Sequence, residues 1–449
     1  MNTIVTNQPK GGVMPSLKFQ KPQTFVLTNG LKVLVVANHK LPRVTFQLQI
    51  DHPLFTEGDK KGVDSLTSAL LGKGSLNITK EAFFEEIDFL GLEMQFHASG
   101  AKAEGLSKYA GRMLELFAEG CLHPNFTQEE LDKERNKLIE ALRSNEKNVQ
   151  HTLARIENLV TFGENHPKGE FTTEATLNHV TLADVIANYQ NYFNPQQAYL
   201  VIIGDVDFET VQTKVTTLFS DWKANPYPTT TYEIPPTVAQ TQITWVNMDH
   251  AVQTDISVVN TMDLPMNDPD YFPVVIANQI LGGGADGRLF LNLREKHGWT
   301  YGSYSTIGAG KYTQKFKASA QVRHNVVGDA IIEILKEIKL LRTTLVSEAD
   351  LQLAKSKYIG NFIMQSQKPE AIARYALHTE IQNLPSDFYE NYIENMNRVT
   401  TDDVLRVAQH FFLADNCHVF AVGKGADIQS ELKKTGLPIA ECLPTGEIL

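Results

Sequence analysis

The segment VTLADVIANYQNYFNPQQAYLVIIG, residues 180–204, returns in outline as VTTDDVLRVAQHFFLADNCHVFAVG, residues 399–423. The same offset joins both ends of the two segments, and TQEEL at 127–131 matches SEADL at 347–351 with an offset that is greater by only one position. One spacing held over so many pairs is not a chance similarity. The repeat therefore predicts two copies of one domain of ~220 residues, which is too long for the unit of a solenoid.

Each copy mixes strands with helices. The β-branched runs at 31–38 and 44–51 predict two paired strands, and a third apolar run predicts a strand at 198–205. Apolar periodicity and capping residues predict helices at about 62–72, 79–90 and 127–147. Thr127 and Glu130 form a sequence-level capping box at the start of the last of these helices.

The second copy repeats this order, with a long helix at about 347–364 and a final strand at 418–423. Strands grouped with helices predict an α+β fold, in which each half is a mostly antiparallel sheet covered by helices. We place the first domain at 20–225 and the second at 239–430. The linker between them, 226–238, is rich in proline, which favours an extended and stiff connector.

Composition excludes several classes of protein. The 449 residues include 42 % hydrophobic and 21 % charged residues, which argues against intrinsic disorder. The net charge of −11 argues against a nucleic-acid-binding protein, which needs a basic face. No apolar run reaches the ~18 residues of a membrane helix, and residues 1–20 predict a flexible lead-in without a signal peptide's apolar core.

Metal-ligand patterns are missing from the sequence. Cys121, Cys417 and Cys442 are far apart and form no C-x-x-C motif, so neither a disulfide framework nor a cysteine zinc site is expected. Thirteen histidines are spread along the chain with no two spaced three or four apart, so no helical turn presents two imidazoles to one metal ion.

The glycine-rich run at 282–287 formally matches G-x-G-x-x-G and has two interpretations. A dinucleotide site requires a strand before the loop, whereas residues 271–281 have helical character. We therefore favour a tight turn between two helices, in which glycine permits positive φ and close backbone approach.

The segment after this turn holds the candidate site. Asp286 is expected to cap a helix that ends at Gly298, Arg294 lies near the helix end, and Tyr301 is expected on the following strand. A guanidinium and a phenol can both donate hydrogen bonds to an oxyanion. From spacing alone, a surface arginine and a half-buried strand tyrosine explain the same pattern.

Taken together, these segments resemble the M16 (pitrilysin, or insulinase-like) zinc metallopeptidases, in their short two-domain bacterial branch. The resemblance rests on the strands at 31–51, the helix GVDSLTSALLGKGS (62–75), the long helix ERNKLIEAL, the linker, and LGGGADGRLFLNLREKHGWTYGSYS. It covers about residues 22–430 and implies a mitochondrial processing peptidase-like fold, in which two two-domain chains close around a peptide chamber.

Active members of this family carry H-x-x-E-H on the first helix and a further glutamate on the long helix. The histidines bind zinc, and the glutamate between them is the general base. Aligned on this motif, the present chain has Ser65, Ser68 and Ala69 instead, and the distal glutamate falls on Ala141, beside Glu140. We therefore expect no metal ligands and no cofactor in this chain.

The second-domain pattern of the family is intact. Its arginine and tyrosine, seven residues apart, reach the substrate carbonyl at the zinc site, and Arg294 and Tyr301 match them. The resemblance implies a subunit that is inactive alone and that contributes this catalytic pair, and half of the chamber, to a heterodimer with a zinc-bearing M16-like partner. Its substrate would be an extended peptide.

Two alternatives stay open. The chain can be a catalytically silent structural or peptide-binding homologue, comparable to the bc1 core subunits and able to form homodimers, with an extended peptide added to a sheet edge. A self-sufficient zinc peptidase would require metal ligands that the alignment does not supply. The compartment is also open between the bacterial cytoplasm and, if the N-terminus was trimmed, the periplasm.

Overall fold

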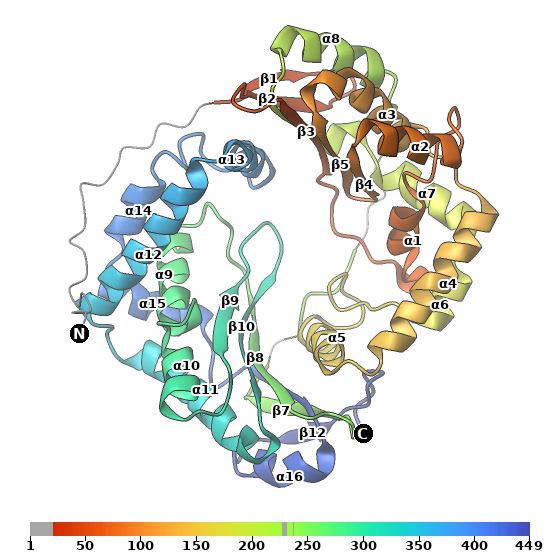
Figure 1. The fold of residues 1–449 in the computed structure, drawn as a ribbon. Coiled ribbons are helices and arrows are strands. Elements are labelled where there is room, and N and C mark those ends of the chain that lie inside the picture. The colour runs from red at the N-terminus through yellow and green to blue at the C-terminus, as the bar shows by residue number, and fades with distance from the viewer. Residues whose placement is uncertain (1–20, 227–230, 237) are drawn as a thin grey trace, which may run out of the picture.

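The computed structural model describes residues 21–226, 231–236 and 238–449, and it consists of two sheets of six strands each. Figure 1 shows the sheets on opposite sides of the molecule, each with its own helices on the outward face. The predicted lead-in and part of the predicted linker (227–230 and 237) lie outside the described residues. Within the described residues, no helix combines the length and apolar character needed to cross a membrane.

The first sheet differs from the expected hairpin. β2 (Lys32–Ala37) and β3 (Arg43–Ile50) are not neighbours, because β6 (Ala198–Gly204) lies between them, parallel to β2 and antiparallel to β3. The prediction that the first two strands pair was therefore wrong. Residues 200–203 of β6 are all buried, so this strand is most stable in the middle of the sheet, where both of its faces are covered. The order is β1 (Gln23–Val26), β2, β6, β3, β5 (Gly100–Leu106) and β4 (Glu93–His97).

The second sheet repeats this arrangement. Its central strand β11 (His418–Gly423) again runs parallel to the strand on one side and antiparallel to the strand on the other. The full order is β12 (Ile439–Glu441), β7 (Gln242–Asn247), β11, β8 (Thr254–Met262), β10 (Gln314–Val322) and β9 (Ser303–Ile307). β11 was predicted to be the final strand, but the chain continues into β12, which adds to the edge of this sheet. The order of the five strands from β2 to β4 is repeated from β7 to β9, which agrees with an internal duplication, whereas the sixth strand differs: β1 is antiparallel to β2 and β12 is parallel to β7.

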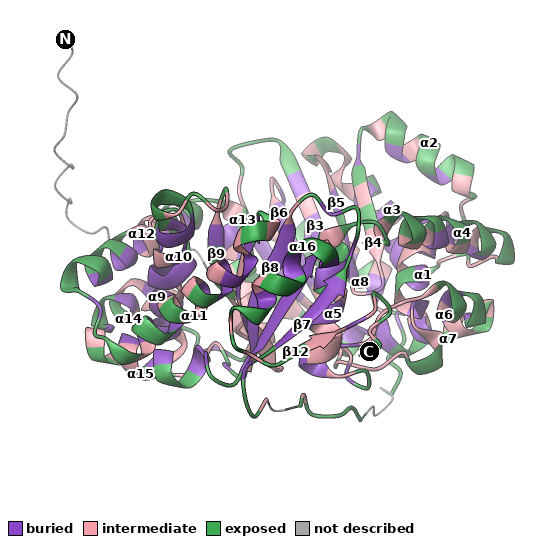
Figure 2. Ribbon diagram, turned by 90° about the horizontal axis from the view of Figure 1, so that it is seen from below, coloured by how far each residue is buried: buried purple, intermediate pink, exposed green. Residues whose placement is uncertain are grey.

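Helices occur in both halves, as predicted. Those of the first half are α1 (Val63–Leu70), α2 (Lys80–Leu90), α3 (Ala110–Leu122), α4 (Gln128–Asn145), α5 (Val149–Phe162), α6 (Glu174–His179), α7 (Leu182–Tyr192) and α8 (Phe208–Phe219). Those of the second are α9 (Tyr271–Gly282), α10 (Arg288–Phe290), α11 (Val327–Thr343), α12 (Glu348–Ser366), α13 (Pro369–Ile381), α14 (Tyr392–Arg398), α15 (Thr401–Phe411) and α16 (Gly425–Lys433). Figure 2 shows buried strands beneath helices, most of which keep an exposed face, whereas α9 is buried along almost its whole length. These two layers confirm the predicted α+β class.

One helix from each half packs against the sheet of the other half. α5, from the first half, packs Leu153 and Ile156 against β7, β8 and β11. α13, from the second half, packs Ala373 and Leu377 against β2 and β6. The two helices begin at positions that are related by the offset of the repeat, so they are equivalent elements of the two copies. In Figure 1 both lie on the inward side of the sheets.

The exchanged helix α5 also carries a buried carboxylate. Glu157 is fully buried, and it accepts hydrogen bonds from Ser257 Oγ at 3.0 Å and from the ammonium groups of Lys315 and Lys317, the latter at 2.8 Å. The strand β10 thus supplies the counter-charges for a helix of the other half. A buried charge is tolerated only when it is paired in this way.

Helix caps repeat between the copies. Thr181 and Thr400 each accept a hydrogen bond from the backbone N–H of an aspartate three residues on, and that aspartate's carboxylate accepts the threonine N–H in return. These are complete capping boxes. The box predicted at Thr127 is only half formed, because Glu130 instead accepts a hydrogen bond from the ammonium of Lys80 at 2.6 Å. The ammonium of Lys80 is thus the partner of the Glu130 carboxylate, in place of the backbone N–H of Thr127.

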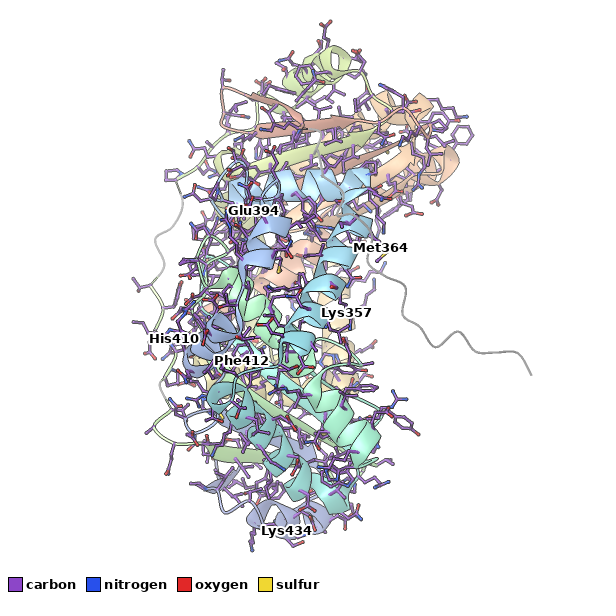
Figure 3. The ribbon with its side chains drawn as sticks, turned by 90° about the vertical axis from the view of Figure 1, so that its left-hand side faces the viewer. Lys357, Met364, Glu394, His410, Phe412 and Lys434 are labelled. Atoms are coloured by element: carbon purple, nitrogen blue, oxygen red, sulfur yellow. The ribbon has the colours of Figure 1, made fainter. Side chains whose placement is uncertain are left out.

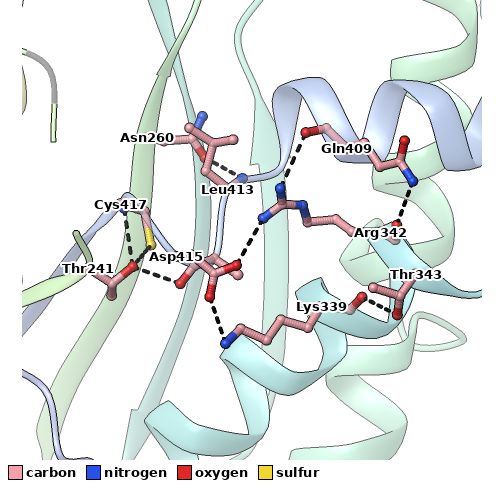
Figure 4. A network of polar contacts seen from close by, with 10 residues as sticks. Thr241, Asn260, Lys339, Arg342, Thr343, Gln409, Leu413, Asp415 and Cys417 are labelled. Atoms are coloured by element: carbon pink, nitrogen blue, oxygen red, sulfur yellow. Dashed lines mark hydrogen bonds and ion pairs between the residues drawn. The ribbon is translucent and has the colours of Figure 1, made fainter. Parts of the chain in front are cut away.

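A polar network holds the turn that leads into β11. Asp415 forms ion pairs with Lys339 at 2.7 Å and Arg342 at 3.6 Å on α11, and Gln409 of α15 donates to the carbonyl of Arg342 (Figure 4). Thr241 Oγ1 donates to the Ala414 carbonyl at 2.7 Å. These contacts fix where the central strand begins.

Candidate functional site

The helix that would carry the zinc motif is α1. It starts after Gly62, whose φ is +102°, and a Cβ at Gly62 would lie 2.5 Å from Leu177 Cδ2, so only glycine fits this turn. Leu66 and Leu70 are buried in the cluster that joins α1 to α4 and α7. Packing of these leucines fixes the orientation of the whole helix.

The residues at the motif positions are not metal ligands. Ser68 Oγ accepts a hydrogen bond from the backbone N–H of Ala98 at 2.9 Å, so it serves to position the end of β4. Ser65 is exposed, and Ala69 is half-buried. Since hydroxyl and methyl groups at these positions supply neither imidazole nor carboxylate, they do not fit zinc. Across residues 21–226, 231–236 and 238–449, no group of three or more histidine, cysteine, aspartate or glutamate side chains is arranged to hold a metal ion.

Ser65 opens into a cavity of about 270 Å³ with acidic walls that the sequence did not predict. The carboxylates there hold the backbone: Glu57 accepts from the N–H groups of Gly62 and Asp64 at 2.6 and 3.0 Å, and Glu170 accepts from the N–H of Glu57 at 2.8 Å. Burial raises the pKa of Glu57 above its usual value, against the lowering effect of these hydrogen bonds. These acids are therefore already engaged in fixing the start of α1.

The distal position on α4 also lacks a ligand. Ala141 and Glu140 are both exposed. Glu134, which precedes them on the same helix, is buried and pairs with Lys137 at 2.8 Å and Lys73 at 3.3 Å. Burial opposes its ionisation, but the two ammonium groups prevail and lower the pKa of Glu134. The buried acidic side chain of α4 is therefore already engaged in ion pairs.

Arg294 lies on a π-helical turn, Leu291–Lys296, that directly continues α10. Leu289 and Leu293 anchor this segment in the core with no exposed surface. The guanidinium of Arg294 lies 4.7 Å from the centre of the Phe290 ring and 3.5 Å from a carboxylate oxygen of Glu295, and its side chain is 46 % exposed. A cation stacked on an aromatic face has fewer available orientations than a free arginine. π-Helical turns occur frequently at functional sites.

Tyr301 lies in the loop before β9, not on the strand as predicted, because β9 begins at Ser303. Thr300 Oγ1 donates to the carbonyl of Gly302 and accepts the N–H of Gly302, which closes a small turn around Tyr301. The Tyr301 side chain is 87 % exposed. The prediction of a strand failed because this local threonine turn delays the start of the sheet.

Arg294 and Tyr301 thus both project into solvent from one segment. No hydrogen bond or ring contact joins the two side chains within the described part of the chain. Gly298, with φ +63°, lets the chain reverse between them. Their hydrogen-bond donors are available to a group outside this chain.

The glycine-rich run forms the tight turn between α9 and α10 that we favoured, but through close backbone approach alone, because none of its glycines has a positive φ. A Cβ at Gly287 would lie 2.8 Å from the Cα of Gly282, so the two backbone segments touch. Asp286 does not cap α10, whose N-cap Gly287 receives no side-chain bond. Asp286 instead pairs with Lys357 of α12, whose position is shown in Figure 3. The stronger ionic partner explains why the predicted cap does not form.

Comparison with known families agrees with this geometry. Residues 32–168 match the model described as insulinase (peptidase family M16), and residues 179–358 match the model described as peptidase M16 inactive domain. The chain belongs to the M16 peptidase family, as its sequence motifs indicated.

Three relatives illustrate the range of the family. The chain is 22 % identical over 401 residues to an uncharacterized zinc protease of Rickettsia felis, covering 86 % of this chain and 94 % of that one. It is 20 % identical over 244 residues to the probable inactive metalloprotease YmfF of Bacillus subtilis, covering 54 % and 55 % of the two chains. It is 22 % identical over 422 residues to the mitochondrial-processing peptidase subunit alpha of Solanum tuberosum, covering 87 % and 79 %.

A solved structure, the peptidase M16 inactive domain from Pseudomonas fluorescens, has the same fold. The TM-score is 0.80 at 22 % identity, with coverage of 90 % of this chain and 98 % of that one. Together with the inactive relative and the replaced ligands at Ser65, Ser68 and Ala69, the family match supports a non-catalytic M16-like subunit.

Proposed function

We propose that this chain is the non-zinc subunit of a heterodimeric M16-like peptidase. It would supply Arg294 and Tyr301 to the zinc site of a partner and form half of the peptide chamber. The observation that carries this proposal is a mismatch within one chain. Two exposed side chains with hydrogen-bond donors project from one segment, Arg294 from an anchored turn and Tyr301 from the loop that follows, while the described residues of the same chain offer no metal site for them to serve.

The chemistry of the pair suits acyl transfer. The metal and its water would belong to the partner. The guanidinium N–H groups of Arg294 and the phenol O–H of Tyr301 would donate hydrogen bonds to the carbonyl oxygen of the substrate as it gains negative charge. Anchoring by Leu293 and stacking on Phe290 hold the arginine before the substrate arrives, which keeps the cost of reorganisation low.

Reconstitution with a zinc-bearing M16 partner tests the proposal. Arg294→Ala and Tyr301→Phe should each lower kcat by about 10²–10³, or about 3–4 kcal/mol of transition-state stabilisation, while leaving assembly unchanged. Arg398→Ala, which removes another exposed arginine, is the matched control and should keep full activity. Wild-type kcat in both site variants would refute the proposal.

A second candidate is a catalytically silent peptide-binding protein. The observation that favours it is that β4 and β9 are end strands of their sheets and pair, among the described residues, with a strand on one side only. Such an edge can accept an extended peptide as an added strand. In this case Arg294 and Tyr301 would be surface residues without a role in turnover.

Sedimentation analysis of the purified chain mixed with candidate partners distinguishes these two candidate functions. A heterodimer containing stoichiometric zinc supports the subunit role. Homodimers alone, together with peptide binding that Arg294→Ala and Tyr301→Phe do not alter, support the silent binding protein.

A further inference from the structure

One face of α12 exposes apolar side chains to solvent. Leu353 is 47 % exposed and Met364 is 62 % exposed. Residues 353, 360 and 364 point in nearly the same direction from a helix, so Gly360 lies between these two apolar side chains on one stripe. A Cβ added at Gly360 would lie more than 4 Å from every described atom outside its own stretch of helix, so packing inside the chain does not require a glycine there. Figure 3 shows where Met364 and Lys357 lie along this helix.

This exposed face of α12 carries no unpaired charge. Within residues 351–366 the only charged side chains are Lys355 and Lys357. Lys355 is buried and donates a hydrogen bond to the carbonyl of Asn397 at 2.9 Å, and Lys357 pairs with Asp286. The exposed polar side chains of this stretch are all neutral, and they belong to Gln352, Ser356, Asn361 and Gln365. A helix face that stays in water usually carries charged residues, which this one lacks.

The equivalent helix of the first half, α4, provides an internal comparison. The two helices begin at positions related by the repeat. The same offset aligns Gln352, Leu353 and Gly360 of α12 with three exposed and charged residues of α4, namely Asp132, Lys133 and Glu140. Charged residues thus occupy the outward positions of one copy, and neutral or apolar residues occupy them in the other. The uncharged face is therefore a property of the second copy and not of the fold.

These properties suit contact with the same face of a second copy. Two copies of a chain with a net charge of −11 repel each other wherever their charged faces meet. In a two-fold contact both copies use the same patch, so the patch must complement itself. Amide side chains such as those of Gln352 and Gln365 meet this requirement because each carries a donor and an acceptor, whereas a carboxylate only accepts. Apolar side chains complement themselves as well.

We propose that α12 is a self-association surface, on which α12 of a second copy crosses near Gly360. The missing side chain at Gly360 lets the two helices approach closely, because the distance between helix axes depends on the side chains at the crossing. Leu353 and Met364, on either side of the crossing, pack against the second helix. A contact made by one helix of each copy is small, so the dimer dissociates on dilution. This inference does not rest on the proposed peptidase role.

Sedimentation velocity of the full chain over a range of concentrations tests the proposal. We expect a monomer–dimer equilibrium in the wild type. The Leu353→Glu/Met364→Glu double variant places carboxylates within the contact of both copies, and should weaken the association by about tenfold or more. The matched control, Asn136→Glu/Ser144→Glu, adds the same charge to the exposed face of α4 and should change the association less than about twofold. Circular dichroism verifies that both variants are folded. Arg294→Ala should leave the association unchanged, so this proposal and the peptidase role are tested separately.

Disulfide cross-linking tests the position of the crossing. The three natural cysteines are at most 1 % exposed, so Gly360→Cys introduces an accessible thiol into a chain whose own thiols are buried. Near the two-fold axis this thiol meets its own copy, and mild oxidation should give a covalent dimer. Glu140→Cys, at the equivalent position of α4, should stay monomeric. The proposal is overturned if the wild type sediments as a monomer at every concentration, if the α12 and α4 double variants associate equally well, or if Glu140→Cys cross-links as readily as Gly360→Cys.

Discussion

The two halves share the order of five strands in their sheets but hold their exchanged helices by different contacts. At equivalent positions of the repeat, α5 has Glu157 and α13 has Leu377. Glu157 is held by two lysines and a serine of the second sheet, whereas Leu377 packs among apolar side chains of the first. Both interfaces also contain apolar contacts, and α13 forms a peripheral ion pair between Glu380 and Lys32 of β2, so the two interfaces differ at this one central position, which is ionic in one and apolar in the other.

This difference makes each exchanged helix specific for the sheet that it covers in the structure. Placed on the first sheet, α5 would bury Glu157 without a counter-charge. Placed on the second sheet, α13 would leave Lys315 and Lys317 facing Leu377. A buried ion pair adds little net stability over an apolar contact, but a mismatched one is costly. The comparison teaches that the duplicated sheets avoid mispairing through unlike interfaces.

The largest expected effect comes from exchanging the character of the apolar interface. Leu377→Glu buries an unpaired carboxylate against β2 and β6, and should lower the free energy of unfolding by more than about 4 kcal/mol. Urea unfolding monitored by circular dichroism measures it. Leu377→Met, which conserves volume, should cost less than about 1.5 kcal/mol. Equal effects of the two variants would mean that this interface does not discriminate charge.

Removing the charge of Glu157 from the other interface should lower the free energy of unfolding by a smaller amount. Glu157→Gln keeps the shape but removes the charge that Lys315 and Lys317 share, and should lower the free energy of unfolding by about 3 kcal/mol. We place it at the low end because both lysine side chains are about a quarter exposed and reach water. The same urea titration applied to Glu164→Gln, an exposed glutamate nearby, gives the background. A result within that background would show that the ionic contacts do not hold α5.

The central strands differ at His418 and Tyr199, the equivalent positions where β11 and β6 carry unlike side chains. His418 is 5 % exposed, neither ring nitrogen has a partner among the described residues, and burial lowers the pKa of His418 to about 4. An unfolded histidine titrates near its usual pKa of about 6.5. Between these values only the unfolded state gains the proton, so stability is intact above pH 6.5 and falls by up to about 3 kcal/mol as the pH drops to 4.

Urea midpoints at pH 7 and pH 4.5 measure this effect in the wild type and in His418→Tyr, which installs the first-half residue. The variant should lose most of this acid sensitivity, whatever its stability at pH 7. His418→Gln, which does not titrate, provides a second comparison. Undiminished acid sensitivity in both variants would assign the effect to other groups.

The smallest effects concern a feature that the halves share. Thr181→Ala and Thr400→Ala each remove one side of a complete capping box, and each should cost about 1 kcal/mol in thermal or urea unfolding. Thr217→Ala, on the exposed face of α8, should stay within about 0.5 kcal/mol of the wild type. A clear inequality between the two cap variants would mean that the halves respond differently even where their contacts match.

Sequence reasoning reached the duplication, the fold class and several of the helices, among them the two long helices α4 and α12, because these depend on periodic and repeated patterns. It failed where a distant segment decides the outcome. No local pattern reveals that β6, which is far downstream of both strands, separates β2 from β3. Glu130 and Asp286 were expected to cap helices but pair with Lys80 and Lys357, which lie far away in the sequence.

For the candidate site, the sequence located Arg294 and Tyr301 and the loss of ligands at Ser65, Ser68 and Ala69. It did not predict the π-helical turn under Arg294, because such a turn has no strong composition signature. The catalytic contribution of the pair stays a prediction until reconstitution tests it.

The exchanged helices have a consequence for biosynthesis. The apolar strip of Leu34, Val36, Val201 and Ile203 is complete once β6 has been synthesised, but its cover, Leu377, lies on a helix near the end of the second half. At ~5–20 residues per second, synthesis of the chain between β6 and this leucine takes roughly 9–35 s. During that time the apolar strip of the nascent chain is exposed to solvent. A ribosome-associated chaperone that covers it would raise the yield of native protein.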